Sequence, residues 1–247
     1  MTTGTAHDDI LTGDETIETD DGPMPAKTAA PHANPNGAVI VVQEAFGVTD
    51  HIVDVAARLA RAGWHAVAPA FFHRQGSPVI AYDDVQSAMP VMGELTAGGI
   101  TTDLTATFEW LERIGFPAAR TAVVGFCMGG SVTLYAGTLL RLGAAVTFYG
   151  GGVSQGRFGL PPLAELAPLL TSPWLGLFGD EDQSIPVEDV ERLRQAAAEA
   201  TIETEVVRYP GAGHGFHCDD RPVAYHPEAA RDAWQRTLGW LDRHVAK

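Results

Sequence analysis

The sequence predicts an α/β fold in which helices cover both faces of a mainly parallel sheet. Short runs of β-branched and other apolar residues recur along the chain, and stretches with apolar residues at helical spacing separate them. An unbroken apolar run is typical of a strand buried on both faces, and strands that alternate with helices form parallel sheets. Because α/β folds of 247 residues commonly form one unit, we expect a single domain over residues 1–247.

The first expected elements lie near the N-terminus. Residues 1–14 are polar, and we expect a loosely ordered segment there. Residues 15–29 are expected to form a hairpin at a sheet edge, because Asp20-Asp21-Gly22 has the composition of a tight turn. The β-branched run at 38–42 predicts a buried strand. Residues 50–62 have apolar residues at helical spacing and end before a glycine, so they predict a helix.

The alternation continues from residue 65 onward. Residues 65–68 predict a strand, and the aromatic, glycine and proline residues of 71–92 predict an excursion with short helical pieces. The remaining strands are predicted from apolar runs, and the remaining helices from apolar residues at helical spacing. The expected helices cover 99–114, 128–141, 187–200 and 228–245, and the expected strands cover 121–126, 144–149, 173–178 and 203–209.

Charge and composition argue against several function classes. The formal net charge of −15 argues against a nucleic-acid partner, because phosphate binding relies on clustered lysine and arginine. The same negative field repels an anionic substrate at a distance, so such a substrate would need a local cation. No window approaches the ~18 consecutive apolar residues of a membrane span, and we expect no membrane partner.

Cysteine usage indicates a reducing compartment. The two cysteines, Cys127 and Cys218, show neither a CxxC pair nor a framework of regular spacing. Residues 1–21 lack the basic start and the apolar core of a signal peptide. We therefore expect a cytoplasmic protein that folds without disulfides, as a monomer or a small homo-oligomer.

A strand-turn-helix motif surrounds Cys127. The sequence Gly-Phe-Cys-Met-Gly at 125–129 joins the expected strand 121–126 to the expected helix 128–141. This pattern is a nucleophile elbow, whose glycines leave room for the neighbouring strand and helix, and it predicts the α/β-hydrolase fold. The positive end of the helix would favour the reactive thiolate. A buried structural cysteine is the alternative, but the placement of the motif favours the catalytic interpretation.

The partners of such a nucleophile follow it in the order acid, then histidine. His214 lies between glycines after the last expected strand, where a histidine is accessible, and it is the expected general base. Three carboxylates, Asp180, Glu181 and Asp182, follow the expected strand 173–178, and their spacing leaves the choice of acid open. A solvated acidic turn is the alternative interpretation of this segment.

An oxyanion hole needs two N–H groups that point at the developing negative oxygen. We expect the backbone N–H of Met128, the residue after the nucleophile, to be one of them. The second is expected from the turn after the strand 38–42, at Ala45.

The run His-Cys-Asp-Asp at 217–220 has the composition of a metal site. No second pair of residues with ligand spacing accompanies it. We therefore expect no metal, and the chemistry of the elbow requires no cofactor.

Taken together, these segments resemble the dienelactone hydrolase family, the carboxymethylenebutenolidases. The likeness runs from about residue 38 to the C-terminal helix, and its segments occur in the family's order and at family-like spacing. The matching segments are Gln43-Glu44-Ala45-Phe46-Gly47-Val48, Arg74-Gln75, Gly125-Phe126-Cys127-Met128-Gly129-Gly130, Gly179-Asp180-Glu181-Asp182 with Ile185-Pro186, and Gly213-His214-Gly215-Phe216.

The resemblance implies roles that the spacing does not assign. It implies that Asp182 is the triad acid, and that Glu44 lies beside the nucleophilic thiol and takes part in its activation. It also implies that Arg74 holds the carboxylate of a substrate, as the local cation that an acidic chain would need. Without the resemblance, Glu44 would be interpreted as a loop residue capping the next helix, and Arg74 as a surface residue.

One position departs from the family pattern. Members that act on dienelactone typically have a second carboxylate-binding arginine four residues after the histidine, where this chain has Cys218, and the nearest arginine is Arg221. Losing one of two charge-assisted contacts would weaken substrate binding by about 1.5–3 kcal/mol. The departure therefore concerns the substrate and leaves the triad untouched. We expect Cys218 to be a small buried residue.

We expect the hydrolysis of a small lactone or activated ester, with or without a carboxylate, through an acyl thioester on Cys127. His214, oriented by Asp182, would then activate water. A broad carboxylesterase or thioesterase is the first alternative. A non-catalytic ligand-binding or redox-sensing member of the fold is the second, and the intact Cys-His-Asp set argues against a binding protein.

Overall fold

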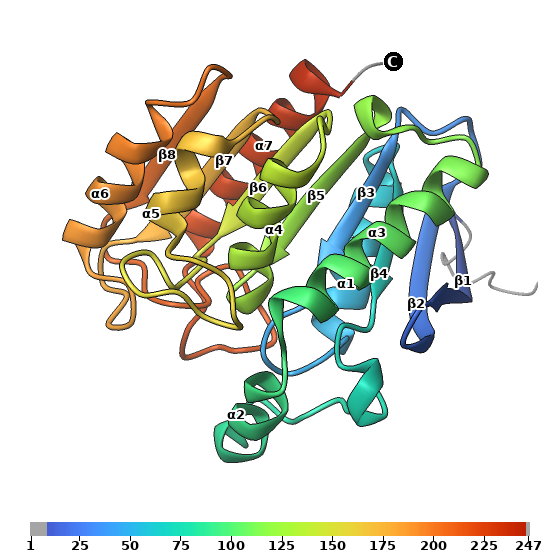
Figure 1. Ribbon diagram of the computed structural model, residues 1–247, viewed down its shortest axis with the longest axis horizontal. Coiled ribbons are helices and arrows are strands. Elements are labelled where there is room, and N and C mark those ends of the chain that lie inside the picture. The colour runs from blue at the N-terminus through green and yellow to red at the C-terminus, as the bar shows by residue number, and fades with distance from the viewer. Residues whose placement is uncertain (1–8, 246–247) are drawn as a thin grey trace, which may run out of the picture.

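The computed structural model describes residues 9–245, which form one eight-stranded sheet with helices on both faces (Figure 1). The strands are β1 Ile10–Thr19, β2 Gly22–Pro31, β3 Ala38–Val42, β4 His65–Pro69, β5 Thr121–Phe126, β6 Ala144–Phe148, β7 Trp174–Gly179 and β8 Thr204–Tyr209. Their order in the sheet is β1-β2-β4-β3-β5-β6-β7-β8. The strands from β4 to β8 run parallel, and β1 and β2 form an antiparallel hairpin at one edge. The predicted fold class is therefore confirmed.

The N-terminal hairpin is longer than the sequence suggested. Its turn lies at Asp20-Asp21, as predicted, but β1 already begins at Ile10, which pairs with Pro31. The expectation of a loose segment is wrong for residues 10–14, while residues 1–8 lie outside the described part of the chain. β1 tolerates polar residues because its ladder hydrogen bonds come from the backbone and most of its side chains face solvent.

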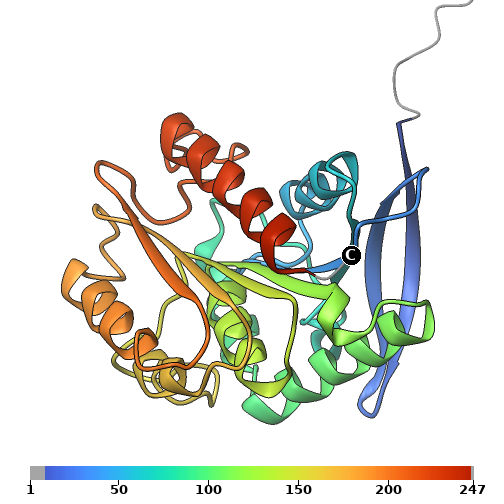
Figure 2. The same cartoon turned by 90° about the horizontal axis from the view of Figure 1, so that it is seen from above.

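Helices cover the sheet in two layers (Figure 2). α1 (Asp50–Arg61) and α7 (Pro227–His244) lie on one face, and α3 (Ala97–Arg113), α4 (Met128–Leu139) and α6 (Val187–Ala197) lie on the other. α4 and α6 end a little earlier than predicted. No helix in the described residues is long and apolar enough to cross a bilayer. The short elements are η1 His73–Gln75, α2 Val85–Gly93, η2 Ala118–Arg120, α5 Leu163–Leu166 and η3 Ala167–Leu169.

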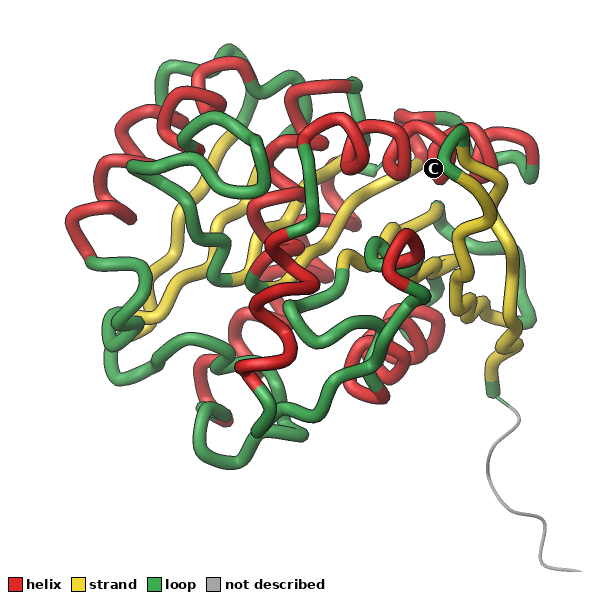
Figure 3. Tube along the Cα trace, turned by 60° about the horizontal axis from the view of Figure 1, so that its bottom comes forward, coloured by secondary structure: helices red, strands yellow, loops and turns green. Residues whose placement is uncertain are grey.

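The segment between β4 and α3 leaves the sheet, as predicted for residues 71–92. It contains η1 and α2, and α2 extends beyond the carboxyl ends of the central strands (Figure 1). Figure 3 brings this edge forward and shows loops lying across it. Because ligands of parallel α/β sheets bind outside the carboxyl ends of the strands, a functional site is expected at this edge.

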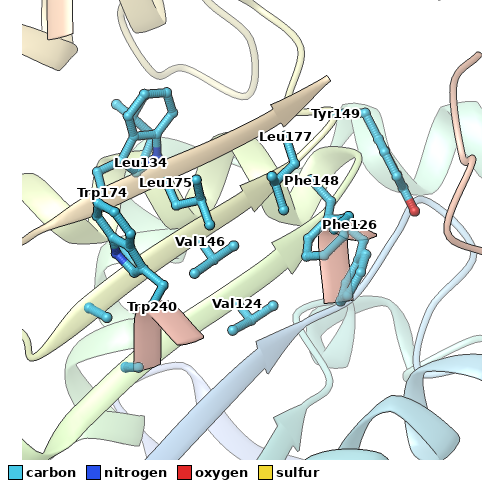
Figure 4. Packing of buried hydrophobic residues seen from close by; sticks show 14 of the residues in the cluster. Val124, Phe126, Leu134, Val146, Phe148, Tyr149, Trp174, Leu175, Leu177 and Trp240 are labelled. Carbon is cyan, nitrogen blue, oxygen red and sulfur yellow. The ribbon is translucent and has the colours of Figure 1, made fainter. Parts of the chain in front are cut away.

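The core lies in the middle of the sheet, where side chains of β5, β6 and β7 pack between the helix layers (Figure 4). Trp174 is fully buried, and its indole N–H donates to the hydroxyl oxygen of Thr147 over 3.0 Å. At the carboxyl end of the strands, the rings of Phe126 and Phe148 stack with their centroids 4.6 Å apart. This packing holds the strand end that precedes Cys127.

Candidate active site

Cys127 occupies a strained turn between β5 and α4. Its φ of 56° and ψ of −115° are a backbone conformation that residues other than glycine rarely adopt. A Cβ atom on Gly125 would lie 2.1 Å from the carbonyl oxygen of Gly129, and one on Gly129 would lie 2.3 Å from that of Val42. Both glycines are therefore required by close backbone contacts, as the elbow motif predicts.

Cys127 faces a cavity of about 280 Å³ at the carboxyl edge of the sheet. The backbone N–H of Cys127 donates to the carbonyl oxygen of Phe148 over 3.0 Å, which anchors the turn on the neighbouring strand. Because α4 begins at the next residue, the positive end of the helix lies beside the thiol. The cavity brings together the predicted site residues Glu44, Ala45, Cys127, Met128 and His214.

Asp182 holds His214 at the rim of this cavity. Nδ1 of His214 lies 2.7 Å from Oδ2 of Asp182. The other carboxylate oxygen accepts hydrogen bonds from the backbone N–H and the hydroxyl of Ser184 over 2.8 and 2.7 Å, and from the N–H of Ile185 over 3.2 Å. The carboxylate is thus fixed from both sides, and Nε2 of His214 is left for proton transfer.

Asp180, the competing acid, is engaged elsewhere. The guanidinium of Arg208 donates to both of its carboxylate oxygens, over 2.7 and 3.0 Å. Glu181 is exposed. Of the three carboxylates whose spacing left the choice open, Asp182, which the resemblance implied, is the one that lies against the histidine.

The charges around His214 favour its protonated form. Burial by itself would lower the pKa of His214, but the negative charge of Cys127 and the hydrogen bond to Asp182 outweigh it and raise the pKa to about 10. Burial by itself would raise the pKa of Asp182, but the hydrogen bonds from His214 and Ser184 hold that pKa below its usual range. The arrangement therefore stabilises the imidazolium form of His214.

Glu44 is a buried carboxylate beside the cavity. Its Oε1 accepts a hydrogen bond from the hydroxyl of Tyr149 over 3.3 Å, and its Oε2 has no hydrogen-bond partner among the described residues. Burial, followed by the charge of Glu44, raises the pKa of Tyr149, so the hydroxyl remains a donor. The ring of Tyr149 also packs against His214, with centroids 5.1 Å apart. An unpaired buried oxygen is costly, and Oε2 of Glu44 is available to accept a hydrogen bond from a group in the cavity.

Both predicted oxyanion donors line the cavity. Met128 is the first residue of α4, so its N–H has no partner within the helix. Within residues 9–245, the N–H of Ala45 donates to no backbone carbonyl. The N–H of Gly129 donates to the carbonyl oxygen of Gln43 over 3.1 Å and ties the two turns together. Two free N–H groups on joined turns are suited to holding one negative oxygen.

Arg74 lies away from this cavity, so the expectation that it binds a substrate carboxylate requires correction. Its guanidinium forms ion pairs with Asp103, which is fully buried, over 2.8 Å and with Asp21 over 2.6 Å. These two carboxylates already neutralise the cation. The arginines that line the cavity are Arg157 and Arg221, and neither forms an ion pair among the described residues.

Three further residues of the site were not assigned from the sequence. Ser184 stands two positions after Asp182, the spacing at which an aspartate accepts a hydrogen bond from the following chain, so a local signal was present. Tyr149 and Arg157 lie in the glycine-containing segment after β6. No periodicity in such a segment marks which side chains face a site.

The residues that follow His214 are packed into the body of the protein. Cys218 is fully buried, as expected, and burial followed by the charge of Glu44 raises its pKa to about 12. Burial also lowers the pKa of His217 to about 3, so that imidazole is neutral. In the part of the chain that the structure describes, no group of three or more His, Cys, Asp or Glu residues is arranged to hold a metal ion.

Comparison with known proteins gives matches over nearly the whole chain. Residues 24–245 match the model of the dienelactone hydrolase family. A protein of Yersinia pestis, provisionally named a carboxymethylenebutenolidase, is 39% identical over 239 residues, which cover 95% of this chain and 89% of the relative. One of the same name from Salmonella typhimurium is 40% identical over 243 residues, with coverage of 96% and 89%.

Solved structures also match the chain over nearly its whole length. The crystal structure of a provisionally named dienelactone hydrolase from Klebsiella pneumoniae is 38% identical, covers 95% of this chain and 99% of that one, and has a TM-score of 0.87. A dienelactone-hydrolase-like promiscuous phosphotriesterase from metagenomic libraries is 22% identical over 95% of this chain and 99% of that one, with a TM-score of 0.77, and shares the fold.

Proposed function

The chain belongs to the dienelactone hydrolase family, and from this premise we propose that it hydrolyses lactones or activated esters through an acyl thioester on Cys127. The observation that carries the proposal is the shared cavity of Cys127 and His214, with Nδ1 of His214 lying 2.7 Å from Asp182. A strained nucleophile, a histidine and an orienting carboxylate are the parts that acyl transfer requires. The reaction needs no cofactor.

At the start of the acylation step, the thiol proton of Cys127 has already passed to His214, and Glu44 promotes this thiolate. The sulfur attacks the carbonyl carbon, and the carbonyl electron pair moves to the oxygen. The N–H groups of Ala45 and Met128 stabilise this oxyanion. When it collapses, the bond to the alcohol oxygen breaks, and His214 returns the proton to that oxygen.

In the deacylation step, a water molecule replaces the alcohol. His214, now neutral and oriented by Asp182, takes a proton from the water as its oxygen attacks the thioester carbon. The carbon–sulfur bond then breaks, the acid product leaves, and Cys127 and His214 return to their ionised forms. A thiolate is a good leaving group, so esters and lactones suit this cycle, whereas amides would be poor substrates.

Two unpaired arginines support an anionic group on the substrate. Arg157 and Arg221 line the cavity without carboxylate partners. In a chain with a net charge of −15, cations left unpaired at a cavity wall offset the general repulsion of anions. We include carboxylate-bearing lactones and esters in the proposed substrate class on this ground.

Rapid acid quenching during turnover of p-nitrophenyl acetate is expected to trap an acetyl group on Cys127. The thioester survives acid, and deacylation needs the imidazole as a base, so His214→Asn should increase the trapped fraction. Mass spectrometry of the peptide that contains Cys127 measures the modification. The same panel should include a dienelactone and simple lactones, with release of acid followed at constant pH.

Two results would contradict the proposed function. An acetyl group found on Ser184 or His214 instead of Cys127 would assign the nucleophile elsewhere. Reversible oxidation of Cys127 by peroxide without turnover of any ester or lactone would favour a redox sensor.

The pH dependence of kcat/KM for an alkyl ester should show a loss of activity as pH rises through about 10. The pKa of His214 is raised to about 10, so the imidazolium that protonates the leaving alkoxide persists below that pH and disappears above it. p-Nitrophenyl acetate is the control, because nitrophenolate leaves without a proton and should not show this loss. A loss centred near the ordinary histidine value of about 6.5 would contradict the raised pKa.

A further inference from the structure

His214 lies between two hollows of the surface. One is the cavity of about 280 Å³ that contains Cys127. The other is a cleft of about 590 Å³ between residues 211–226 and the Tyr82-Asp83 segment, and Cys127 does not line it. His214 and Arg221 are the residues common to both. His214 therefore stands at the boundary between the two hollows.

We propose that this second hollow, the 211–226 cleft, binds the alcohol portion of the ester, and that it accepts a hydroxyl-rich alcohol. The inference rests on the proposed function, because it assigns the two halves of an ester to two sides of His214. Nδ1 of His214 is taken by Asp182, so the alcohol oxygen must approach Nε2 to be protonated. Such a transfer requires a separation of roughly 2.6–3.2 Å, which places the alcohol on the histidine side of the scissile carbon.

The cavity that contains Cys127 has a different lining. Its wall includes the apolar side chains of Met89 and Met92 from α2 and of Phe158, with Arg157 next to Phe158 in the chain. This surface suits the acyl chain of a substrate. The acyl group would therefore meet a largely apolar wall with Arg157 beside it, and the alcohol would meet the polar groups of the 211–226 cleft.

The lining of the 211–226 cleft indicates hydrogen bonding to hydroxyl groups. Asp83 and Asp220 are exposed there, and neither forms an ion pair among the described residues. Nδ1 of His226 accepts the N–H of Ala229 over 3.3 Å, so a neutral His226 carries its proton on Nε2 and can donate. The polar side chains that line the cleft are those of Tyr82, Asp83, His214, Asp220, Arg221, Tyr225 and His226. The hydroxyl of Tyr82 already forms a hydrogen bond with that of Thr49 over 2.9 Å.

A hydroxyl group both donates and accepts, so it can use the carboxylates and the donors of this cleft at once. An apolar alcohol of the same size would displace water from those groups without replacing its hydrogen bonds, and a site that forms hydrogen bonds discriminates against such an analogue. We therefore expect glycerol, or another polyol, to fit the cleft better than propan-1-ol.

Competition between alcohols and water for the acyl-enzyme tests this assignment. By microscopic reversibility, an alcohol bound in the cleft can take the acetyl group from Cys127: its oxygen bonds to the carbonyl carbon, the carbon–sulfur bond breaks, and its proton passes to His214. With p-nitrophenyl acetate as donor, glyceryl acetate should form at least roughly tenfold faster than propyl acetate at equal alcohol concentration. The ratio of ester to acetate, measured by chromatography, is the readout.

Val223→Trp and Val79→Trp form a matched pair. Val223 lines the cleft and is fully exposed, so an indole there narrows the cleft without entering the core. Val79 is 65% exposed and lines a different hollow. Val223→Trp should lower the glycerol preference roughly tenfold, whereas Val79→Trp should keep the ratio of the unmodified protein. Asp220→Asn should also lower the preference, because it replaces an ionic acceptor by an amide.

The possible outcomes distinguish a failure of this inference from a failure of the proposed function. If Cys127 is not acetylated, the proposed function fails, whatever ratio of ester to acetate is measured. If Cys127 is acetylated but glycerol and propan-1-ol compete equally, or Val223→Trp and Val79→Trp change the ratio equally, the cleft is not the alcohol site.

Discussion

Replacement of Cys127 by alanine is expected to lower kcat/KM for esters and lactones by on the order of 10⁴-fold or more. The change removes the sulfur that forms the covalent bond in the proposed mechanism, while the proposed oxyanion donors Ala45 and Met128 remain. Alanine keeps the Cβ atom, so the strained backbone at φ 56° is disturbed no further. The rate is measured with purified protein on p-nitrophenyl acetate and a simple lactone, after thermal unfolding has shown that the variant folds.

Cys218→Ala is the matched control for this variant. Cys218 is the second of the two cysteines, is fully buried and does not line the cavity. Its replacement should cost about 1 kcal/mol of stability through lost packing and leave ester turnover near that of the unmodified protein. If Cys127→Ala turns over substrate at the rate of Cys218→Ala, Cys127 is not the nucleophile.

Replacement of Gly129 by alanine is expected to lower the free energy of unfolding by about 3 kcal/mol and to remove most of the activity. The added Cβ atom would lie 2.3 Å from the carbonyl oxygen of Val42 and 2.5 Å from that of Gln43. Both contacts are with backbone, which cannot move aside as a flexible side chain can. The turn that would have to shift also carries Glu44 and Ala45, so the damage would reach the carboxylate and the oxyanion donor of the proposed mechanism.

Gly239→Ala separates this steric effect from the general effect of losing a glycine. Gly239 lies in α7, and a Cβ atom there would meet nothing within 4 Å. Because alanine favours a helix interior over glycine, this control should gain about 0.5–1 kcal/mol. Urea unfolding followed by circular dichroism measures both variants. A Gly129→Ala protein as stable and active as Gly239→Ala would show that the elbow does not need its second glycine.

Local chemistry explains why much of the fold was predictable. The strand Ala38–Val42 is buried on both faces, and the unbroken apolar run that predicted it is the direct consequence of that burial. The glycines around Cys127 were predictable for a similar reason, because their backbone contacts forbid any side chain. The predicted hairpin began too late and missed the part of β1 that starts at Ile10. Backbone pairing at an exposed sheet edge leaves no apolar pattern in the sequence.

Side-chain direction in loops was decided by tertiary structure alone. Asp180 and Asp182 stand two positions apart after the same strand, yet one pairs with Arg208 and the other with His214. Arg74 was expected at the substrate, but the buried carboxylate of Asp103 draws its guanidinium away from the cavity. These choices depend on partners from distant segments, and no local pattern records them.

By itself, then, the sequence determined the parallel α/β sheet, the elbow at Cys127 and the accessible histidine, His214, because burial and glycine contacts impose their own patterns on the chain. Only the tertiary structure brought Asp182 against His214, a pairing that the spacing left open and the resemblance implied, and only it decided that Arg157 and Arg221 line the cavity of Cys127. The physical reason is that an ion pair or a cavity wall is formed by residues far apart in the chain. The conformation of the loops that carry these residues depends on how they pack against the sheet.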